Sequence, residues 1–113
     1  MKVMIESPFK GIGLYPDEAF MDECENRDYL QECIRDCFDR EEFPFASHQM
    51  YTDALDDNNS VQRYLGIAAG FLWGDVADKI VVYYDRGISS GMRLGIKRYS
   101  MDKLVEFRSL YER

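Results

Sequence analysis

Residues 78–96 read DKIVVYYDRGISSGMRLGI, and this stretch decides the fold class. The apolar run from Ile80 to Tyr84, rich in β-branched and aromatic side chains, is typical of a buried strand. It ends in Asp85, and a loop of Gly and Ser residues then leads into a short helical pattern. α/β proteins build pockets for a phosphate or a sugar from this order of strand, loop and helix start. The simpler alternative is a turn in which Gly serves the geometry and Ser caps the helix.

Outward from this stretch, strand and helix patterns alternate along the whole chain. We expect strands over residues 3–6, 43–47, 80–84 and 105–110. Helices are expected from a start between Pro16 and Asp22 to about Arg40, from Ser60 past Leu72, and over residues 90–99. Residues 49–59 are polar and end in Asp-Asp-Asn-Asn-Ser, which predicts a loop with Ser60 as the following N-cap. The two longer helices carry apolar stripes at three- and four-residue steps: Leu30, Cys33, Ile34, Cys37 and Phe38 in the first, and Val61, Tyr64, Leu65, Ala68 and Leu72 in the second.

This alternation predicts one α/β domain over residues 1–113. Strands separated by helices of this length form a parallel sheet covered on both faces. The expected architecture is a small three-layer Rossmann-like (flavodoxin-like) fold with about four parallel strands flanked by helices. Right-handed crossovers place every strand-to-helix loop at the carboxyl edge of the sheet, where open α/β proteins bind their ligands.

Composition and charge limit the partners and the location. With 113 residues and a net charge of −7, the chain lacks the basic surface that tracks a nucleic-acid polymer. Local N–H groups and one Arg can still bind a small anion. No apolar run approaches the length needed to span a bilayer, and the start MKVMIESPF lacks a signal-peptide core, so we expect a cytoplasmic protein that does not enter membranes.

The three cysteines do not predict a metal site. Cys24, Cys33 and Cys37 all fall in the first predicted helix, and the only His lies elsewhere in the sequence. Cysteines at helical spacing beside apolar residues are usually small core side chains. A zinc site requires more ligands than this region offers. We therefore expect free thiols, no metal and no cofactor.

Three loops are expected to meet at the carboxyl edge of the sheet, over residues 6–11, 46–51 and 85–91. They would bring together Glu6, His48 and Asp85, with serines 7, 89 and 90 around them. A carboxylate at the end of a central strand is costly unless it is solvated or paired, so Glu6 and Asp85 are the candidate catalytic residues.

Other residues near these loops have a structural as well as a functional interpretation. His48 either faces the ligand or bonds a neighbouring carbonyl. Tyr15 and Tyr51 either stack on a ligand or cover the core. Asp78 either contributes to the site or fixes the start of a strand.

With these loops placed, the sequence resembles the nucleoside 2-deoxyribosyltransferase superfamily, and especially its short bacterial and phage-type members. The resemblance covers most of the chain and rests on these pieces: IESPF at 5–9, PFASH at 44–48, GIAAG at 66–70 with Trp73, ADKIVVY at 77–83, Asp85, GIS at 87–89 and GMRLG at 91–95. The last piece is the most specific, because it is similar to the family's G-M-E-L-G helix start. Loops and resemblance together predict that the following residues bind the ligand: Ser7, Pro8, Phe9, Gly11, Tyr15, His48, Tyr51, Asp78, Gly87, Ser89, Ser90, Gly91, Met92 and Arg93.

The resemblance also implies a mechanism, from which the chain departs at one position. In the transferases a Glu at that helix start attacks the anomeric carbon, and here Arg93 stands in its place. A guanidinium cannot form a glycosyl ester and stays charged at any working pH. Either Glu6 or Asp85 replaces the missing carboxylate, or the pocket binds without cleaving. An Arg in the first turn of a helix suits a phosphate, unless it pairs with one of those two carboxylates instead.

Two functions follow, together with a simpler third. The first is a phage-like binding protein that sequesters or senses a nucleotide or a nucleotide-derived molecule. The second is a nucleotide N-glycosidase or deoxyribosyltransferase that cleaves the bond between base and sugar. The third is a partner protein with a vestigial pocket. Because Tyr64, Phe71 and Trp73 suit a subunit contact as well as a core, we also expect a homo-oligomer.

Overall fold

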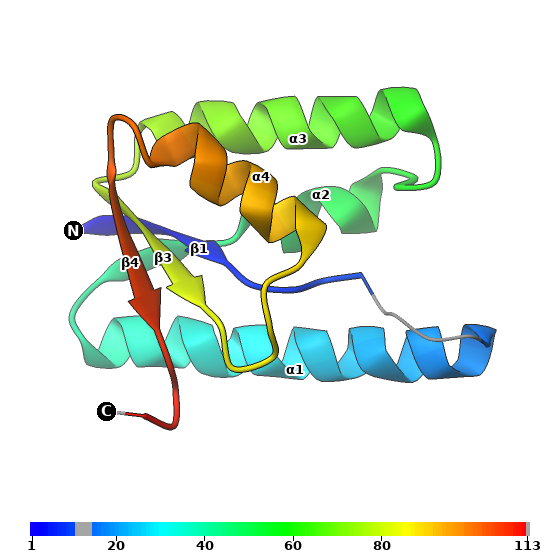
Figure 1. Cartoon of the computed structure of the whole chain (residues 1–113), viewed down its shortest axis with the longest axis horizontal. Coiled ribbons are helices and arrows are strands. Elements are labelled where there is room, and N and C mark those ends of the chain that lie inside the picture. Colours follow the sequence, from blue (N-terminus) through cyan, green and yellow to red (C-terminus); the bar gives the residue numbers. More distant parts are fainter. Residues whose placement is uncertain (11–14, 113) are drawn as a thin grey trace.

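We describe the protein from a computed structural model, in which residues 1–10 and 15–112 are described. The chain forms four strands and four helices in the described part (Figure 1). Their bounds, in chain order, are β1 Lys2–Glu6, α1 Pro16–Asp39, β2 Phe43–Phe45, α2 Ser47–Ala54, α3 Ser60–Asp75, β3 Lys79–Tyr83, α4 Ser90–Tyr99 and β4 Leu104–Arg108.

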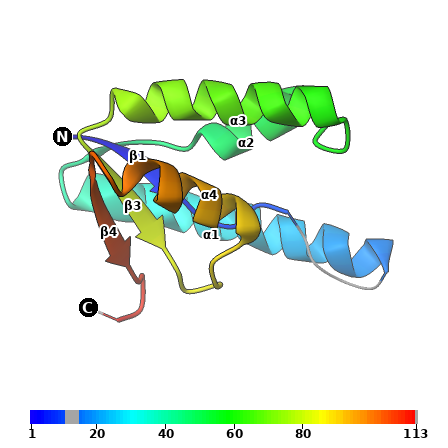
Figure 2. The same cartoon turned by 45° about the horizontal axis from the view of Figure 1, so that its top comes forward.

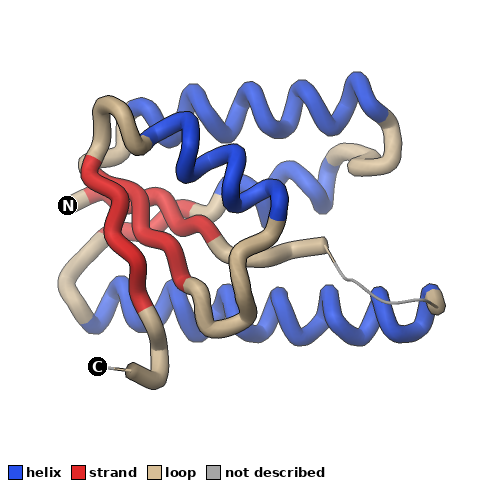
Figure 3. Tube along the Cα trace, viewed as in Figure 1, coloured by secondary structure: helices blue, strands red, loops and turns tan. Residues whose placement is uncertain are grey.

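The four strands form one parallel sheet in the order β2-β1-β3-β4, which confirms the predicted fold class (Figure 3). Glu6 at the end of β1 is level with Val82 of β3. The chain runs from β1 to one neighbour and then returns to the other side, so the strand order reverses between β1 and β3. Such a reversal is the place where open α/β sheets form a ligand crevice at their carboxyl edge.

The helices cover the two faces of the sheet as separate layers. Figures 1 and 2 show α1 on one side and α2, α3 and α4 on the other. Alternation along each strand divides the core in the same way. Ile5 and Tyr83 pack towards α1, whereas Met4 and Val82 pack towards Met92 of α4.

Two local expectations about the middle of the chain were wrong. Residues 47–54 form helix α2, although residues 49–59 were expected to be a loop. The N-cap of α3 is Asn59 and not Ser60, because the Asn59 side chain accepts hydrogen bonds from the N–H groups of Val61 and Gln62. Both Asn and Ser favour this position, and only the local geometry decides between them.

The apolar stripes of the two long helices lie differently from a simple core-facing arrangement. In α1, Leu30, Cys33 and Cys37 are buried, but Phe38 is exposed. The α3 stripe, with Val61 and Leu72, points to solvent, and the buried side of α3 contains Gly70 and Gly74 instead. Glycine has no side chain and allows α3 to lie close to its neighbours. The packed face of α3 is therefore the glycine face and not the apolar stripe.

Two general properties concern membranes and metals. Across the described residues, no helix combines the length and the hydropathy that a membrane crossing requires. The same residues contain no cluster of three or more His, Cys, Asp or Glu side chains that suits a metal ion. The three cysteines carry free thiols, and Cys33 and Cys37 are part of the core against α1.

Candidate functional site

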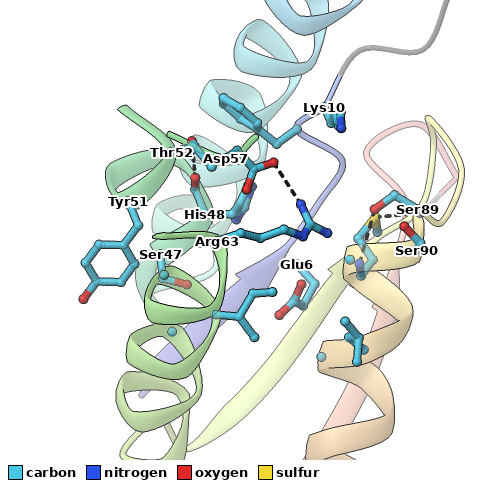
Figure 4. Close-up of a pocket in the computed structure, with 18 of the residues that line it drawn as sticks. Glu6, Lys10, Ser47, His48, Tyr51, Thr52, Asp57, Arg63, Ser89 and Ser90 are labelled. Atoms are coloured by element: carbon cyan, nitrogen blue, oxygen red, sulfur yellow. Dashed lines mark hydrogen bonds and ion pairs between the residues drawn. The ribbon is translucent and has the colours of Figure 1, made fainter. Parts of the chain in front are cut away.

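A pocket of about 190 Å³ opens where the strand order reverses, between the end of β1 and helices α2, α3 and α4 (Figure 4). The loop after β1, helices α2 and α3 and the start of α4 all contribute polar residues, and α2 and α3 also contribute apolar ones. The predicted carboxyl-edge position of the site is therefore where the structure has a cavity.

Glu6 is a carboxyl group inside this pocket without a protein partner. Its side chain forms no hydrogen bond or ion pair with any described residue. Every fully buried side-chain oxygen in the described residues has a hydrogen-bond partner, so the Glu6 oxygens are not fully buried and open onto the cavity. Burial raises the pKa of Glu6 to about 8. At pH 7 the group is mostly protonated and can donate a hydrogen bond.

Glu6 fits because α4 carries no side chain opposite it. A Cβ placed on Gly95 would lie 2.5 Å from Oε1 of Glu6 and 2.8 Å from its carboxyl carbon. Glycine at this position allows the carboxyl group to lie directly against the helix backbone.

Ser7 and His48 form a polar pair in the pocket. Ser7 Oγ lies 3.0 Å from Nε2 of His48, and the proton on that bond belongs to either atom depending on the imidazole tautomer. Burial lowers the pKa of His48 to about 4, so the ring is neutral at physiological pH. The edge-on ring of Phe9, 6.5 Å away between centroids, supports the imidazole.

The first turn of α4 presents backbone donors to the pocket. Ser89 is the N-cap, and its Oγ accepts a hydrogen bond from the Met92 N–H at 3.2 Å. The N–H groups of Ser90 and Gly91 have no partner in the described chain, and both residues line the pocket. Free N–H groups at the positive end of a helix favour an anion.

Arg63, from the first half of α3, places a cation in the same pocket. Its guanidinium extends into the pocket and forms an ion pair with Asp57 at 2.9 Å (Figure 4). Lys10 adds a second positive charge at the pocket mouth. Arg93, the predicted phosphate ligand, is exposed and does not line the pocket.

The remaining wall is apolar and aromatic. Tyr51 and Leu55 come from the region of α2, and Ile67 and Phe71 come from α3. Gly66 and Gly70, one turn apart on α3, also line the cavity and allow the α2 region to pack closely against α3. The pocket therefore combines these apolar side chains with polar ones from the same two helices, such as Thr52 and Gln62.

Several predicted residues do come together around this cavity. They are Glu6, Ser7, Phe9, His48, Tyr51, Ser89, Ser90, Gly91 and Met92. Met92 is almost fully buried and contributes the packing beneath the helix start.

Asp85 is not among them, although it follows β3 on the same edge. It lies on the α1 side of the sheet, where Tyr29 donates to its Oδ2 at 2.5 Å and the Leu110 N–H donates at 3.0 Å. Burial would raise the pKa of Asp85, but these bonds and one from the Ser109 hydroxyl outweigh it and lower the pKa. The reason is strand alternation, because Asp85 follows Tyr83 by two residues and so shares its face.

Other predicted ligand-binding residues also lie away from the pocket. Asp78 is at the amino edge of the sheet, where it accepts a hydrogen bond from the Lys2 N–H at 2.7 Å. Pro8 is buried beside the pocket without lining it, and Tyr15 is an exposed residue at the start of α1. Gly87 has a φ of 90°, so it serves the turn after β3. Gly11 is outside the described residues.

Arg63 is a charged pocket residue that the strand-end loops did not reveal. Arg63 lies within helix α3, whereas the expected site residues came from the loops that follow the strands. A signal was nevertheless present, because Gly66, Gly70 and Gly74 recur every four residues in α3. A glycine stripe indicates a helix face that approaches other groups closely, and Arg63 lies near that face.

Comparisons with known proteins identify a family for the chain. A family described as "Domain of unknown function (DUF7768)" has a sequence model that matches residues 1–107. Neither the curated proteins nor the solved structures include a significant match. The chain therefore belongs to the DUF7768 family of domains of unknown function.

Proposed function

We propose that this pocket binds a small phosphorylated nucleoside, and that the protein sequesters or senses that molecule. The observation that carries the proposal is that one pocket combines groups that favour an anion with an apolar wall. Arg63 and the unpartnered N–H groups of Ser90 and Gly91 favour an anion, whereas Ile67 and Phe71 of α3 favour a flat apolar group. A nucleotide has both of these parts joined by a sugar.

The phosphate is expected at the start of α4. Two backbone N–H groups, the helix dipole and a guanidinium all stabilise negative charge there. Arg63 pairs with Asp57, so a phosphate has to compete with the Asp57 carboxylate for the guanidinium.

The sugar is expected between the phosphate and the base, beside Glu6 and the Ser7–His48 pair. A protonated Glu6 and a neutral His48 offer both donors and acceptors to sugar hydroxyls without burying a net charge. The resemblance of residues 5–9 and 87–95 to the nucleoside 2-deoxyribosyltransferase superfamily supports the same class of ligand.

A thermal-shift screen tests this proposal. Nucleosides and their mono- and diphosphates are incubated with the protein, and the ligands are recovered afterwards by chromatography. We expect at least one phosphorylated nucleoside to raise the unfolding temperature and to be recovered intact. Failure of every nucleotide to stabilise the protein would contradict the proposal.

Cleavage of the base–sugar bond is a second candidate, favoured by the unpartnered Glu6. As a general acid, protonated Glu6 would give its proton to the departing base nitrogen while water attacks the anomeric carbon. The attacking water then releases a proton to solvent, and Glu6 takes up a proton from solvent to complete the cycle. The bond between base and sugar breaks, and the products are a free base and a sugar phosphate. Chromatography of the same incubations separates the two functions, because only cleavage releases a base.

The variant Glu6→Gln identifies the group responsible. Under the cleavage function, base release should stop in Glu6→Gln while nucleotide binding persists. Base release that continues at the wild-type rate in this variant would exclude Glu6 as the acid.

A further inference from the structure

Both oxygens of the Glu6 carboxyl group are open to the pocket. Neither oxygen has a hydrogen-bond partner or an ion pair in the described chain, and neither is completely buried by it. Figure 4 shows Glu6 between α3 and α4, where its carboxyl group lies inside the cavity. A carboxyl group forms hydrogen bonds through each of its two oxygens, so it has two adjacent positions for a ligand.

Two polar pairs of the pocket are already formed within the protein. Ser7 Oγ lies 3.0 Å from Nε2 of His48, and the Arg63 guanidinium is paired with Asp57 at 2.9 Å. Glu6 differs from both pairs, because its partners must come from outside the described chain. A buried polar group without a partner is destabilising, so a ligand with a hydrogen-bonding group for each of the two oxygens binds best here.

The Glu6 carboxyl group lies one helical turn from the backbone donors at the start of α4. It packs against Gly95, where a Cβ would be 2.5 Å from its Oε1 and 3.2 Å from its Oε2. Gly91, with its unpartnered N–H, is four residues earlier on the same face of α4, or about 6 Å along the helix axis. When the phosphate of a nucleoside 5′-monophosphate binds at that helix start, its sugar hydroxyls come this far from the phosphate, whereas the hydrogen-bonding edge of the base lies further away. The carboxyl group is therefore placed for the sugar and not for the base.

The two hydroxyls of ribose match the two oxygens of one carboxyl group. They sit on adjacent carbons, and each of them both donates and accepts a hydrogen bond. A carboxylate on the ribose hydroxyls is also how dinucleotide-binding α/β proteins hold this sugar. A 2′-deoxyribose has only one of the two hydroxyls, so it would leave one oxygen of Glu6 buried without a partner.

We propose that the pocket selects ribonucleotides over 2′-deoxyribonucleotides, because the Glu6 carboxyl group binds both ribose hydroxyls. This inference rests on the proposed function and deepens it, since nucleotide binding alone does not require a particular sugar. The selectivity is opposite to the one that the resemblance to the deoxyribosyltransferases implies, because the sugar of those enzymes lacks the 2′-hydroxyl.

Calorimetric titration with matched pairs of nucleotides tests the inference. The wild type is titrated at pH 7 with the 5′-monophosphates of adenosine, guanosine, cytidine and uridine, and with the 2′-deoxy counterpart of each. We expect the ribonucleotide that binds best to bind about tenfold more tightly than its deoxy counterpart. Glu6→Ala and Glu6→Met each remove both oxygens and should reduce this difference to about twofold or less.

The matched control is Arg63→Ala, which changes the pocket without changing Glu6. Loss of the guanidinium should weaken the binding of both members of a pair to the same extent, so the ratio of their affinities stays at the wild-type value. Circular dichroism establishes that each variant is folded. If one of the two Glu6 variants does not fold, the other variant still decides the question.

The possible failures of the inference and of the proposed function are distinct. Equal or tighter binding of the deoxynucleotide by the wild type would overturn the ribose selectivity and leave nucleotide binding intact. A ribose preference that persists in the Glu6 variants would overturn the role of Glu6. Absence of binding by all the nucleotides tested would overturn the proposed function and this inference together.

Discussion

At the scale of single residues, Glu6 determines the chemistry of the pocket. Its carboxyl group has lost much of its hydration without gaining a hydrogen bond or an ion pair from the described chain. Such a group is destabilising when ionised, and a protein gains nothing structural from keeping it. A bound hydroxyl or amide would supply the missing partner, so the arrangement is one in which ligand binding completes the site.

The pKa of Glu6 predicts how folding stability depends on pH. Its folded pKa of about 8 exceeds the ordinary value of 4.5, so the folded state holds this proton more tightly than the unfolded state. The penalty for ionising Glu6 is absent below pH 4.5, grows as the pH rises towards 8, and is constant above it. Glu6→Gln should therefore be more stable than the wild type at pH 8.5, on the order of 2–4 kcal/mol, and nearly equal at pH 4.5.

Urea unfolding of both proteins at the two pH values measures this difference. Glu112→Gln is the matched control, because Glu112 is exposed near the end of the chain and should show no such pH dependence. A Glu6→Gln effect of equal size at both pH values would show that the carboxyl group is not desolvated in the folded protein.

Two arginines give the clearest residue-level test of the phosphate end. Arg63 lines the pocket and Arg93 does not, although both lie on helices beside it. Arg63→Ala should weaken nucleotide binding by about ten- to a hundredfold, which is the loss of one charge-assisted contact. Arg93→Ala should leave the affinity unchanged, and calorimetric titration of both variants measures this. Equal losses in the two variants would contradict the assignment of Arg63.

At the scale of elements, the close contact between α4 and β1 shapes the pocket. Gly95 is the point of contact, and a methyl group there would overlap the Glu6 carboxyl group. The helix start above it holds Ser90 and Gly91 at the cavity, so any shift of α4 also moves the proposed phosphate site.

Substitutions on α4 test this contact. Gly95→Ala should destabilise the protein by about 1–3 kcal/mol through overpacking. Gly91→Ala is the control on the same helix, because its Cβ would meet nothing closer than the Ser89 Oγ at 4.0 Å. The pair Glu6→Ala with Gly95→Ala should cost less than the sum of the two single changes, since removing the carboxyl group makes space for the methyl group. Strict additivity in thermal unfolding would contradict the contact.

Elements with a strong local sequence pattern could be predicted from the sequence. Elements that depend on tertiary contacts could not. The strand at 80–84 and the helix at 90–99 have strong local patterns, and both lie close to their observed bounds. Helix α2 was missed because it is short and half-polar, and its stability comes from packing against α3, as in the approach of Leu55 to Gly66.

The site, too, was predicted only in part, because tertiary contacts decide which side chains reach the pocket. Loops at strand ends indicated Glu6, Ser7 and Ser89, and all three line the pocket. Asp85 was assigned to the wrong face, although strand alternation continued from Tyr83 places it on the α1 side. The position of Arg63 depends on how α3 is rotated, which its apolar stripe misrepresents, because that stripe faces solvent.

At the scale of the whole molecule, a buried ionic network holds the sheet together on the side away from the pocket. Arg108 of β4 forms two bonds with Glu42, which precedes β2, at 2.8 and 3.1 Å. Lys79 of β3 bonds the same carboxylate at 2.8 Å. The network thus connects both outer strands with a central one, and it leaves the pocket side free for a ligand.

Removing Arg108 should therefore destabilise the fold. Arg108→Ala leaves Glu42 buried with one partner fewer and should cost about 3–5 kcal/mol at pH 7. The hydrogen bond from Arg108 holds the pKa of Glu42 at about 2, so this stabilisation is present above pH 4.5 and is lost as the pH falls towards 2. The exposed Arg98, paired with the similarly accessible Asp75, is the control, and Arg98→Ala should cost about 1 kcal/mol or less. Urea unfolding that gives equal losses for both variants would contradict the role of the network.

The central claim is that the pocket recognises a phosphate and a nucleoside together. Calorimetric titration of the wild-type protein with a nucleoside monophosphate, and with the same nucleoside without its phosphate, tests it most directly. We expect the monophosphate to bind about tenfold more tightly or better, and this advantage to disappear in Arg63→Ala. Equal affinity of the wild type for the nucleoside and its monophosphate would contradict the account.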